Sequence, residues 1–216
     1  MLRTFNALRG FAIRATDGRI GTVSDIYFDD HSWRVRHCVV DSDRWFAERY
    51  VLIAPRSLSV VDSARQELWV RLAKAEVARS RRADTDKPVS RQGGGVITSI
   101  RRLARWSSLH RRRPATALPD RHLRSCRAII GNRLKAIDGL IGRVDDLLID
   151  DKGWTIRALI VDTGDRRLAS PRVVVAAPQV GAISWPAASV SIGLTRDAVL
   201  AAPVYAPLSS EATLCS

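Results

Sequence analysis

The sequence predicts a mainly all-β protein, built from two small antiparallel β-barrels in tandem that are each followed by a short helical turn. One observation behind this prediction is an internal repeat: residues 10–41 and 131–162 align without gaps and are identical at 14 of 32 positions. The other is the pattern inside each copy, where short runs of Val, Ile, Leu, Trp and Tyr alternate with turns that contain Asp and Gly. Because short curved sheets usually close to hide their edges, we expect each copy to form a barrel.

The length and the charge of the chain fit two domains with a basic connection. A chain of 216 residues is long enough for two small domains. We expect a first domain, a linker, a second domain and a tail at residues 1–79, 80–127, 128–203 and 204–216. The formal net charge is +13, and residues 79–127 alone hold 14 basic and three acidic side chains, a net +11. Most of the excess positive charge therefore lies between the two copies.

Each copy contains five predicted strands. They cover residues 11–15, 20–28, 33–41, 49–54 and 66–72 in the first copy, and residues 132–136, 141–149, 154–162, 172–177 and 187–193 in the second. The stretch between Arg172 and Arg196 has no charged residue and is long enough to raise the question of a membrane span. Pro178, Pro186 and several serines interrupt it, so we interpret it as sheet.

Turns and helical ends complete each copy. The Asp-Gly steps at residues 17–18 and 138–139 are β-turn signals, because Gly accepts a positive φ and Asp bonds to nearby backbone amides. The wider Asp-Gly-x-x-Gly pattern lacks the Lys-Ser/Thr of a phosphate loop, so its glycines are interpreted as serving backbone geometry. Helical turns are predicted at residues 72–79 and 194–201, and Thr195 is the candidate N-cap of the second.

The basic connection has two parts. Residues 80–95 are polar and end in three glycines, which is typical of a flexible linker. In residues 96–113 apolar side chains recur at helical spacing between arginines, which predicts a short basic amphipathic helix. Such helices bind anionic membrane surfaces or nucleic-acid phosphates, and a solvated Arg-rich linker is the alternative. The candidate anion or membrane contacts are Arg101, Arg102, Arg105, Arg111, Arg112 and Arg113.

Nothing in the sequence points to catalysis or to a metal. No His is paired with a Ser or Cys at a recognisable spacing. Cys38, Cys126 and Cys215 form no CxxC pair, which favours a reducing compartment over a disulfide framework or a zinc site. The first ten residues lack the apolar core of a secretion signal. We therefore expect a cytoplasmic protein with no enzyme activity, no cofactor, no metal site and no catalytic residue.

Acidic hairpins occur at the same place in both copies. Each reads Asp-Asp-x-x-Trp, and the candidate partner contacts are Asp29, Asp30, Trp33, Asp150, Asp151 and Trp154. Their structural interpretation is that Asp serves the turn and that Trp covers the end of the sheet. Their functional interpretation is contact with a partner protein or with the basic segment of the same chain.

The order of these features resembles the PRC-barrel family, named for the cytoplasmic domain of the photosynthetic reaction centre H subunit and found also in a ribosome maturation factor. The resemblance covers nearly all of residues 8–79 and 129–203. It implies a small, mostly antiparallel barrel that acts as a docking or assembly module, with no catalytic residues to transfer. We therefore expect a non-enzymatic tandem PRC-barrel protein that binds a protein partner. Association with RNA, or with the inner face of the membrane, through residues 96–113 is the alternative.

Overall fold

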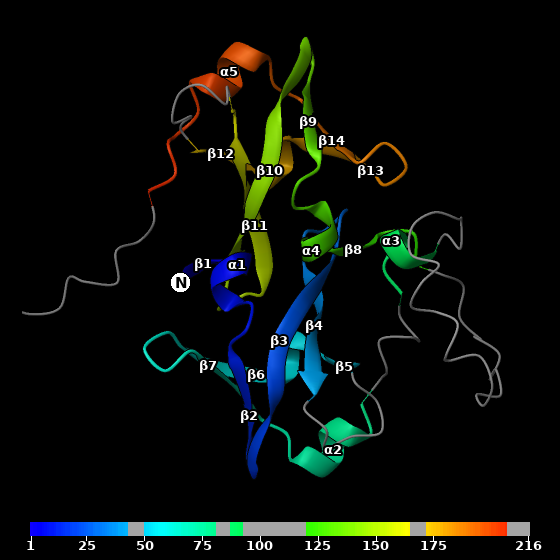
Figure 1. Cartoon of the computed structure of the whole chain (residues 1–216), viewed down its shortest axis with the longest axis vertical. Coiled ribbons are helices and arrows are strands. Elements are labelled where there is room, and N and C mark those ends of the chain that lie inside the picture. Colours follow the sequence, from blue (N-terminus) through cyan, green and yellow to red (C-terminus); the bar gives the residue numbers. More distant parts are fainter. Residues whose placement is uncertain (43–49, 81–86, 93–119, 165–171, 207–216) are drawn as a thin grey trace, which may run out of the picture.

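The computed structural model describes residues 1–42, 50–80, 87–92, 120–164 and 172–206. Within these ranges the chain is mainly β, and its strands form two seven-stranded sheets, neither of which closes into a ring of hydrogen-bonded strands. The two sheets follow one another along the long axis of the molecule (Figure 1). The prediction of a mainly all-β chain is therefore confirmed, whereas the expected closure into barrels is not seen in the hydrogen bonding.

The sheet of the first repeat has the order β5-β4-β3-β2-β7-β6. These strands are β2 (Ala12–Ala15), β3 (Gly18–Asp29), β4 (Val35–Ser42), β5 (Tyr50–Ile53), β6 (Leu58–Asp62) and β7 (Glu67–Val70). Only the β2–β7 pair is parallel among the described strands of this sheet. The 3-10 turn η1 (Pro55–Ser57) leads into β6, and α2 (Lys74–Ala78) follows β7 inside the predicted helical turn.

The second repeat has the same order, β12-β11-β10-β9-β14-β13. Its elements are β9 (Arg133–Ala136), β10 (Gly139–Asp150), β11 (Thr155–Asp162), β12 (Arg172–Ala176), η2 (Ala177–Gln179), β13 (Val180–Ser184), β14 (Ser189–Ile192) and α5 (Arg196–Leu200). Thr195 caps α5, as predicted, by accepting a hydrogen bond from the N–H of Ala198. The uncharged stretch forms β12, β13 and β14, and none of the helices in the described ranges has the length and apolar character to cross a bilayer.

The N-terminal arm of each repeat lies on the other repeat. β1 (Leu2–Thr4) pairs with β10 of the second repeat, and β8 (Leu123–Ser125) pairs with β3 of the first. Each strand leads into a short helix, α1 (Phe5–Leu8) or α4 (Cys126–Ile129). In Figure 1 α1 stands beside β10 and α4 beside β3. The two repeats thus exchange their arms reciprocally, and the second arm spans the boundary that the sequence places between linker and second domain.

The length of β3 explains why an arm can add to it. β2 pairs with the first part of β3, from Gly18 to Thr22, and leaves the far end of that edge open. β8 fills this end by pairing with residues 27–29, just as β1 fills residues 148–150 of β10. An exposed strand edge carries unpaired backbone groups, so the exchange satisfies groups that a single repeat leaves open.

The arms also complete the hydrophobic core. Phe5 and Leu8 of the first arm, and Cys126 and Ile129 of the second, are buried in one continuous cluster that extends through both repeats. Full burial of a large apolar side chain contributes about 1.5–3 kcal/mol. The repeats therefore share a core as well as their sheet edges.

The hairpins meet where the two repeats join. The N–H of Val35 donates to the carbonyl of Trp154 at 2.8 Å, and the N–H of Ile156 donates to the carbonyl of Trp33 at 2.7 Å. Both tryptophans have a positive φ, 59° and 47°, which is rare for a bulky side chain and needs support from its surroundings. These paired hydrogen bonds provide that support.

Candidate partner-binding groove

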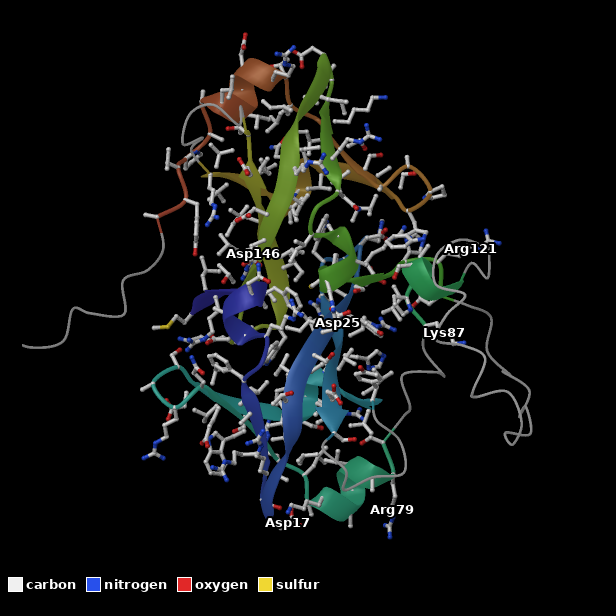
Figure 2. The ribbon with its side chains drawn as sticks, in the orientation of Figure 1. Asp17, Asp25, Arg79, Lys87, Arg121 and Asp146 are labelled. Carbon is white, nitrogen blue, oxygen red and sulfur yellow. The ribbon has the colours of Figure 1, made fainter. Side chains whose placement is uncertain are left out.

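Two buried aspartates fix the starts of the arm helices. Asp25 accepts hydrogen bonds from the hydroxyl of Ser125 at 2.5 Å and from the N–H of Arg127 at 3.1 Å. Asp146 is its counterpart and accepts the N–H of Asn6 at 3.2 Å. Figure 2 labels both aspartates near the middle of the molecule. Burial raises the pKa of Asp146, and the amide hydrogen bonds that it accepts offset this only in part.

A second pair of aspartates binds the arginines of the arms. Asp151 accepts from Nε of Arg3 at 2.6 Å, and Asp30 accepts from Nε of Arg124 at 2.5 Å. Burial alone would raise the pKa of Asp151, but hydrogen bonds from the amino group of Met1 and from Arg3 outweigh it, so the pKa lies below its ordinary value. Two of the candidate partner contacts, Asp30 and Asp151, therefore hold the arms in place through ion pairs.

Two other candidate contacts serve the hairpin turns. Asp29 accepts the N–H of Ser32 at 2.8 Å. Asp150 accepts the N–H of Lys152 at 3.1 Å and a hydrogen bond from Arg157 at 3.0 Å. The hydrogen bond from Arg157 is the main cause that holds the pKa of Asp150 below its ordinary value. These carboxylates have the turn-forming role that is usual for Asp in a hairpin.

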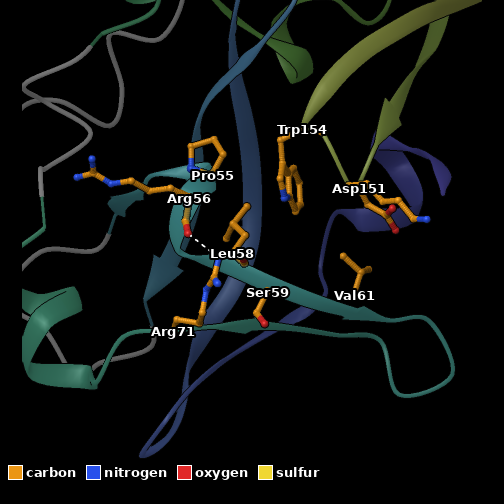
Figure 3. A pocket seen from close by; sticks show the side chains of 10 residues that line it. Pro55, Arg56, Leu58, Ser59, Val61, Arg71, Asp151 and Trp154 are labelled. Carbon is orange, nitrogen blue, oxygen red and sulfur yellow. Dashed lines mark hydrogen bonds between the residues drawn. The ribbon is translucent and has the colours of Figure 1, made fainter.

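The two repeated tryptophans have different surroundings. Trp33 stacks on Phe28, with 5.5 Å between the ring centroids. Trp154 is buried and borders a groove between the repeats (Figure 3). The internal repeat thus gives both residues the same backbone geometry but only Trp154 a place in this groove.

The groove has a volume of about 680 Å³ and is open to solvent. One side is formed by η1 and β6 of the first repeat, and the other by residues 151–154 of the second. Trp154, Pro55 and Leu58 supply the apolar part of its mixed lining, and Figure 3 shows the indole facing the latter two side chains. β6 ends the hydrogen-bonded order of the described strands in its sheet, so the groove lies beside a sheet edge.

Three cationic side chains belong to this groove. Arg71 donates from Nη2 to the carbonyl of Arg56 at 2.9 Å, the bond drawn in Figure 3, and this nitrogen lies 3.5 Å from the carbonyl oxygen of Leu58. Arg56 and Lys152 are exposed, and within the described ranges neither side chain has an acceptor. Arg56 extends outward in Figure 3, so its charge lies at the rim.

The first repeat has an Asp-Gly-x-x-Gly turn, an acidic hairpin and a terminal helix around a curved sheet. A comparison with known protein families agrees with these features. Residues 3–75 match the PRC-barrel domain family. No match was found among curated proteins. The matched range begins in the first arm and ends in α2, so it includes the arm that lies on the other repeat. It also includes η1, β6 and Arg71, which form one side of the groove.

The second repeat lacks the arginines that the first repeat brings to the groove. The N–H of Arg71 donates to the carbonyl of Ser57, and the N–H of Gly193 donates in the same way to the carbonyl of Gln179. This match makes Gly193 the equivalent of Arg71 and Pro178 the equivalent of Arg56. These arginines were not predicted from the sequence, although their occurrence in only one copy is the signal that could have indicated them.

The remaining sequence predictions fall outside this groove. The candidate helix at residues 96–113, with its six arginines, lies outside the described residues. Across the part of the chain that the structure describes, no three His, Cys, Asp or Glu side chains are grouped to hold a metal ion. Cys38 and Cys126 are buried free thiols. Burial, with a smaller effect from Asp25, raises the pKa of Cys38 to about 12, so this thiol is protonated at neutral pH.

Proposed function

We propose that this chain is a non-enzymatic assembly module, in which two PRC-type barrels in tandem bind a segment of a partner protein. The groove beside β6 carries the proposal, because both repeats build it and it is open along a sheet edge. An extended peptide binds such an edge through backbone hydrogen bonds and fills the neighbouring groove with alternate side chains. Trp154, which is largely buried in the core, contributes a small apolar area to the lining of this groove.

The use of the repeated carboxylates supports a binding role. Asp30 and Asp151 bind the arginines of the arms, and Asp25 and Asp146 fix the starts of the arm helices, so all four carboxylates have structural roles. The resemblance of both repeats to the cytoplasmic domain of the reaction centre H subunit supports a docking role. The buried thiols Cys38 and Cys126 support a cytoplasmic location.

A photo-crosslinking amino acid placed at Ser59 tests the proposal. Ser59 lines the groove, whereas its neighbour Val60 is exposed on the same strand but does not line it, and therefore serves as the matched control. In cells of the native host, irradiation is expected to join one partner to the Ser59 variant and not to the Val60 variant. The purified partner should then bind the chain, and Ser59→Trp should weaken that binding more than Val60→Trp. Equal crosslinking at both positions, or none at Ser59, would contradict the proposal.

A second candidate function is association with an anionic membrane surface or RNA through residues 96–113. The net charge of +11 over residues 79–127 favours it, because a cluster of arginines attracts phosphate groups. Under this proposal, deletion of residues 96–113 abolishes binding to anionic vesicles or to RNA and leaves the Ser59 crosslink intact. Equal binding by the deleted and complete chains would exclude it.

A further inference from the structure

We propose that the partner segment taken by the groove is an acidic peptide, whose carboxylates bind Arg71, Arg56 and Lys152 while its apolar side chains pack on Trp154. This inference rests on the proposed function and specifies its partner. The two copies of the repeat differ at the positions that form this groove, because Pro178 and Gly193 of the second copy stand where the first has two arginines. The two arginines are therefore particular to this groove and do not recur in the second copy.

Arg71 is held in a position suited to a carboxylate. Its Nη2 atom is fixed by the carbonyl of Arg56 at 2.9 Å, and among the described residues no acceptor takes its Nε–H or Nη1–H groups. A guanidinium carries five N–H donors in one plane and can bind both oxygens of a carboxylate at once. Because part of the side-chain entropy is already lost in the free protein, binding costs less than with a mobile arginine.

Among the described residues, the one carboxylate that lines the groove does not compete for these cations. Asp151 is bound by Arg3 at 2.6 Å and by the amino group of Met1 at 2.5 Å. Its negative charge is thus offset by two cations that lie outside the set of lining residues. Arg56, Arg71 and Lys152 therefore leave the groove with net positive charge.

The shape of the groove favours a peptide over a small anion. Sites for small molecules usually enclose most of the ligand, whereas this groove is open and bordered by exposed side chains at Arg56, Ser59 and Lys152. Arg56 lines the groove and extends outward at its rim (Figure 3), where it can bind a ligand that continues beyond the groove. An extended peptide that lies beside β6 contacts Arg71 on the wall of the groove and Arg56 at its rim at the same time.

Titration calorimetry on the full chain tests this inference with synthetic peptides. The probe is an acetylated, amidated heptapeptide in which glutamates alternate with valine and leucine, and its control has glutamine in place of every glutamate. We expect the glutamate peptide to bind more tightly than the glutamine peptide, with an affinity that falls as salt rises. Arg71→Met should weaken binding about tenfold, and Arg56→Gln and Lys152→Gln about threefold each.

Arg65→Gln is the matched control variant. Arg65 is 74% exposed on the turn after β6 and does not line the groove, so its loss removes the same charge nearby and should change the affinity less than about twofold. Lys152→Gln keeps the test valid if Arg71→Met disturbs the fold, since the Lys152 side chain makes no hydrogen bond within the described ranges.

The remaining outcomes overturn the inference and leave the proposed function to its own test. If both peptides bind equally, the groove takes peptides without selecting for acid. If neither binds while the Ser59 crosslink persists, the partner segment has a different chemistry. If inorganic pyrophosphate binds more tightly than the glutamate peptide, and loses affinity in Arg71→Met, the groove is a site for small anions.

Discussion

Arg3 reaches from the first repeat to Asp151 in the second, with 2.6 Å between Nε and Oδ2, although 148 positions separate the two residues in sequence. The same pair recurs as Arg124 and Asp30, at equivalent positions of the internal repeat. All four side chains are largely shielded from solvent, between 10% and 15% exposed. The same kind of Arg–Asp ion pair therefore fixes each of the two exchanged arms. Because these side chains are shielded from solvent, a charge left without its partner costs free energy.

Removal of either arginine should destabilise the whole molecule. We expect Arg3→Met and Arg124→Met each to lower the free energy of unfolding by about 2 kcal/mol, because the aspartate left behind loses a charge-assisted hydrogen bond. Urea denaturation followed by circular dichroism measures this. Arg65→Gln, which removes an exposed charge, should change the free energy by less than about 0.5 kcal/mol. If Arg3→Met and Arg65→Gln change the free energy of unfolding equally, the Arg3–Asp151 ion pair contributes nothing to stability.

The effect of Arg3→Met should also depend on pH. The pKa of Asp151 lies below its ordinary value of 3.8 in the folded protein, so the stability it contributes is present above that value and is lost as the pH falls through the lowered one. The free-energy difference between the wild type and Arg3→Met should therefore shrink in acid. A difference that grows as the pH falls would contradict the assigned role of this ion pair.

Asp146 should behave in the opposite way. Burial raises its pKa in the folded state, so the folded protein binds this proton more tightly than the unfolded chain does. Its contribution to stability then falls as the pH rises from 3.8 through the raised value. Asp146→Asn does not titrate at this position, so it should gain stability relative to the wild type over this window and then level off. Denaturation at a series of pH values measures the difference in stability between Asp146→Asn and the wild type. A difference that does not change with pH would contradict the raised pKa of Asp146.

The second glycine of each Asp-Gly-x-x-Gly turn should not accept a side chain. A Cβ atom on Gly21 would overlap the carbonyl oxygen of Asp41, and one on Gly142 would overlap that of Asp162. We expect Gly21→Ala and Gly142→Ala to cost about 3 kcal/mol each, because the neighbouring strand must shift. Gly193→Ala, where the nearest atom is 3.8 Å from the added carbon, should cost less than about 1 kcal/mol. Thermal unfolding of the three variants measures the contrast, and equal losses would contradict it.

The reciprocal arms predict that two fragments of the chain complement one another. Residues 1–80 lack the strand that fills the edge of β3, and residues 120–216 lack the strand that fills the edge of β10. Mixed fragments should therefore form a one-to-one complex in size-exclusion chromatography with light scattering. The double variant with Arg3→Met and Arg124→Met should weaken that complex. Two fragments that fold as separate monomers and ignore one another would show that each repeat is complete without exchange.

Most of the regular strands were predictable to within about two residues, because their side chains alternate and the pattern recurs in both copies. β6 and β13 were missed, since Leu58–Asp62 and Val180–Ser184 are short and lie directly after 3-10 turns. β1 and β8 were missed for another reason. A strand of three residues is too short to show a periodic pattern, and the strands with which β1 and β8 pair lie more than 90 positions away. The pairs Arg3/Arg124 and Thr4/Ser125, which extend the repeat upstream of Gly10, are the signal that would have revealed them.

The groove was less accessible to sequence reasoning than the fold. Trp154 and Asp151 were selected because both copies contain them, and they do border the groove. Arg56, Arg71 and Lys152 were missed, because comparison of the repeats draws attention to what is shared. The three cations come together only through the packing of η1, β6 and the bend after β7 against a hairpin of the other repeat, which no local pattern encodes.

The exchanged arms impose an order on synthesis. Arg3 is synthesised 148 residues before its partner Asp151, an interval of roughly 7 to 30 s at 5–20 residues per second. During that interval the edge of β3 also waits for β8, which is not made until residue 125. The first repeat therefore leaves the ribosome with an unfilled edge and an unplaced apolar arm, and this is the stage at which a chaperone has the most to protect.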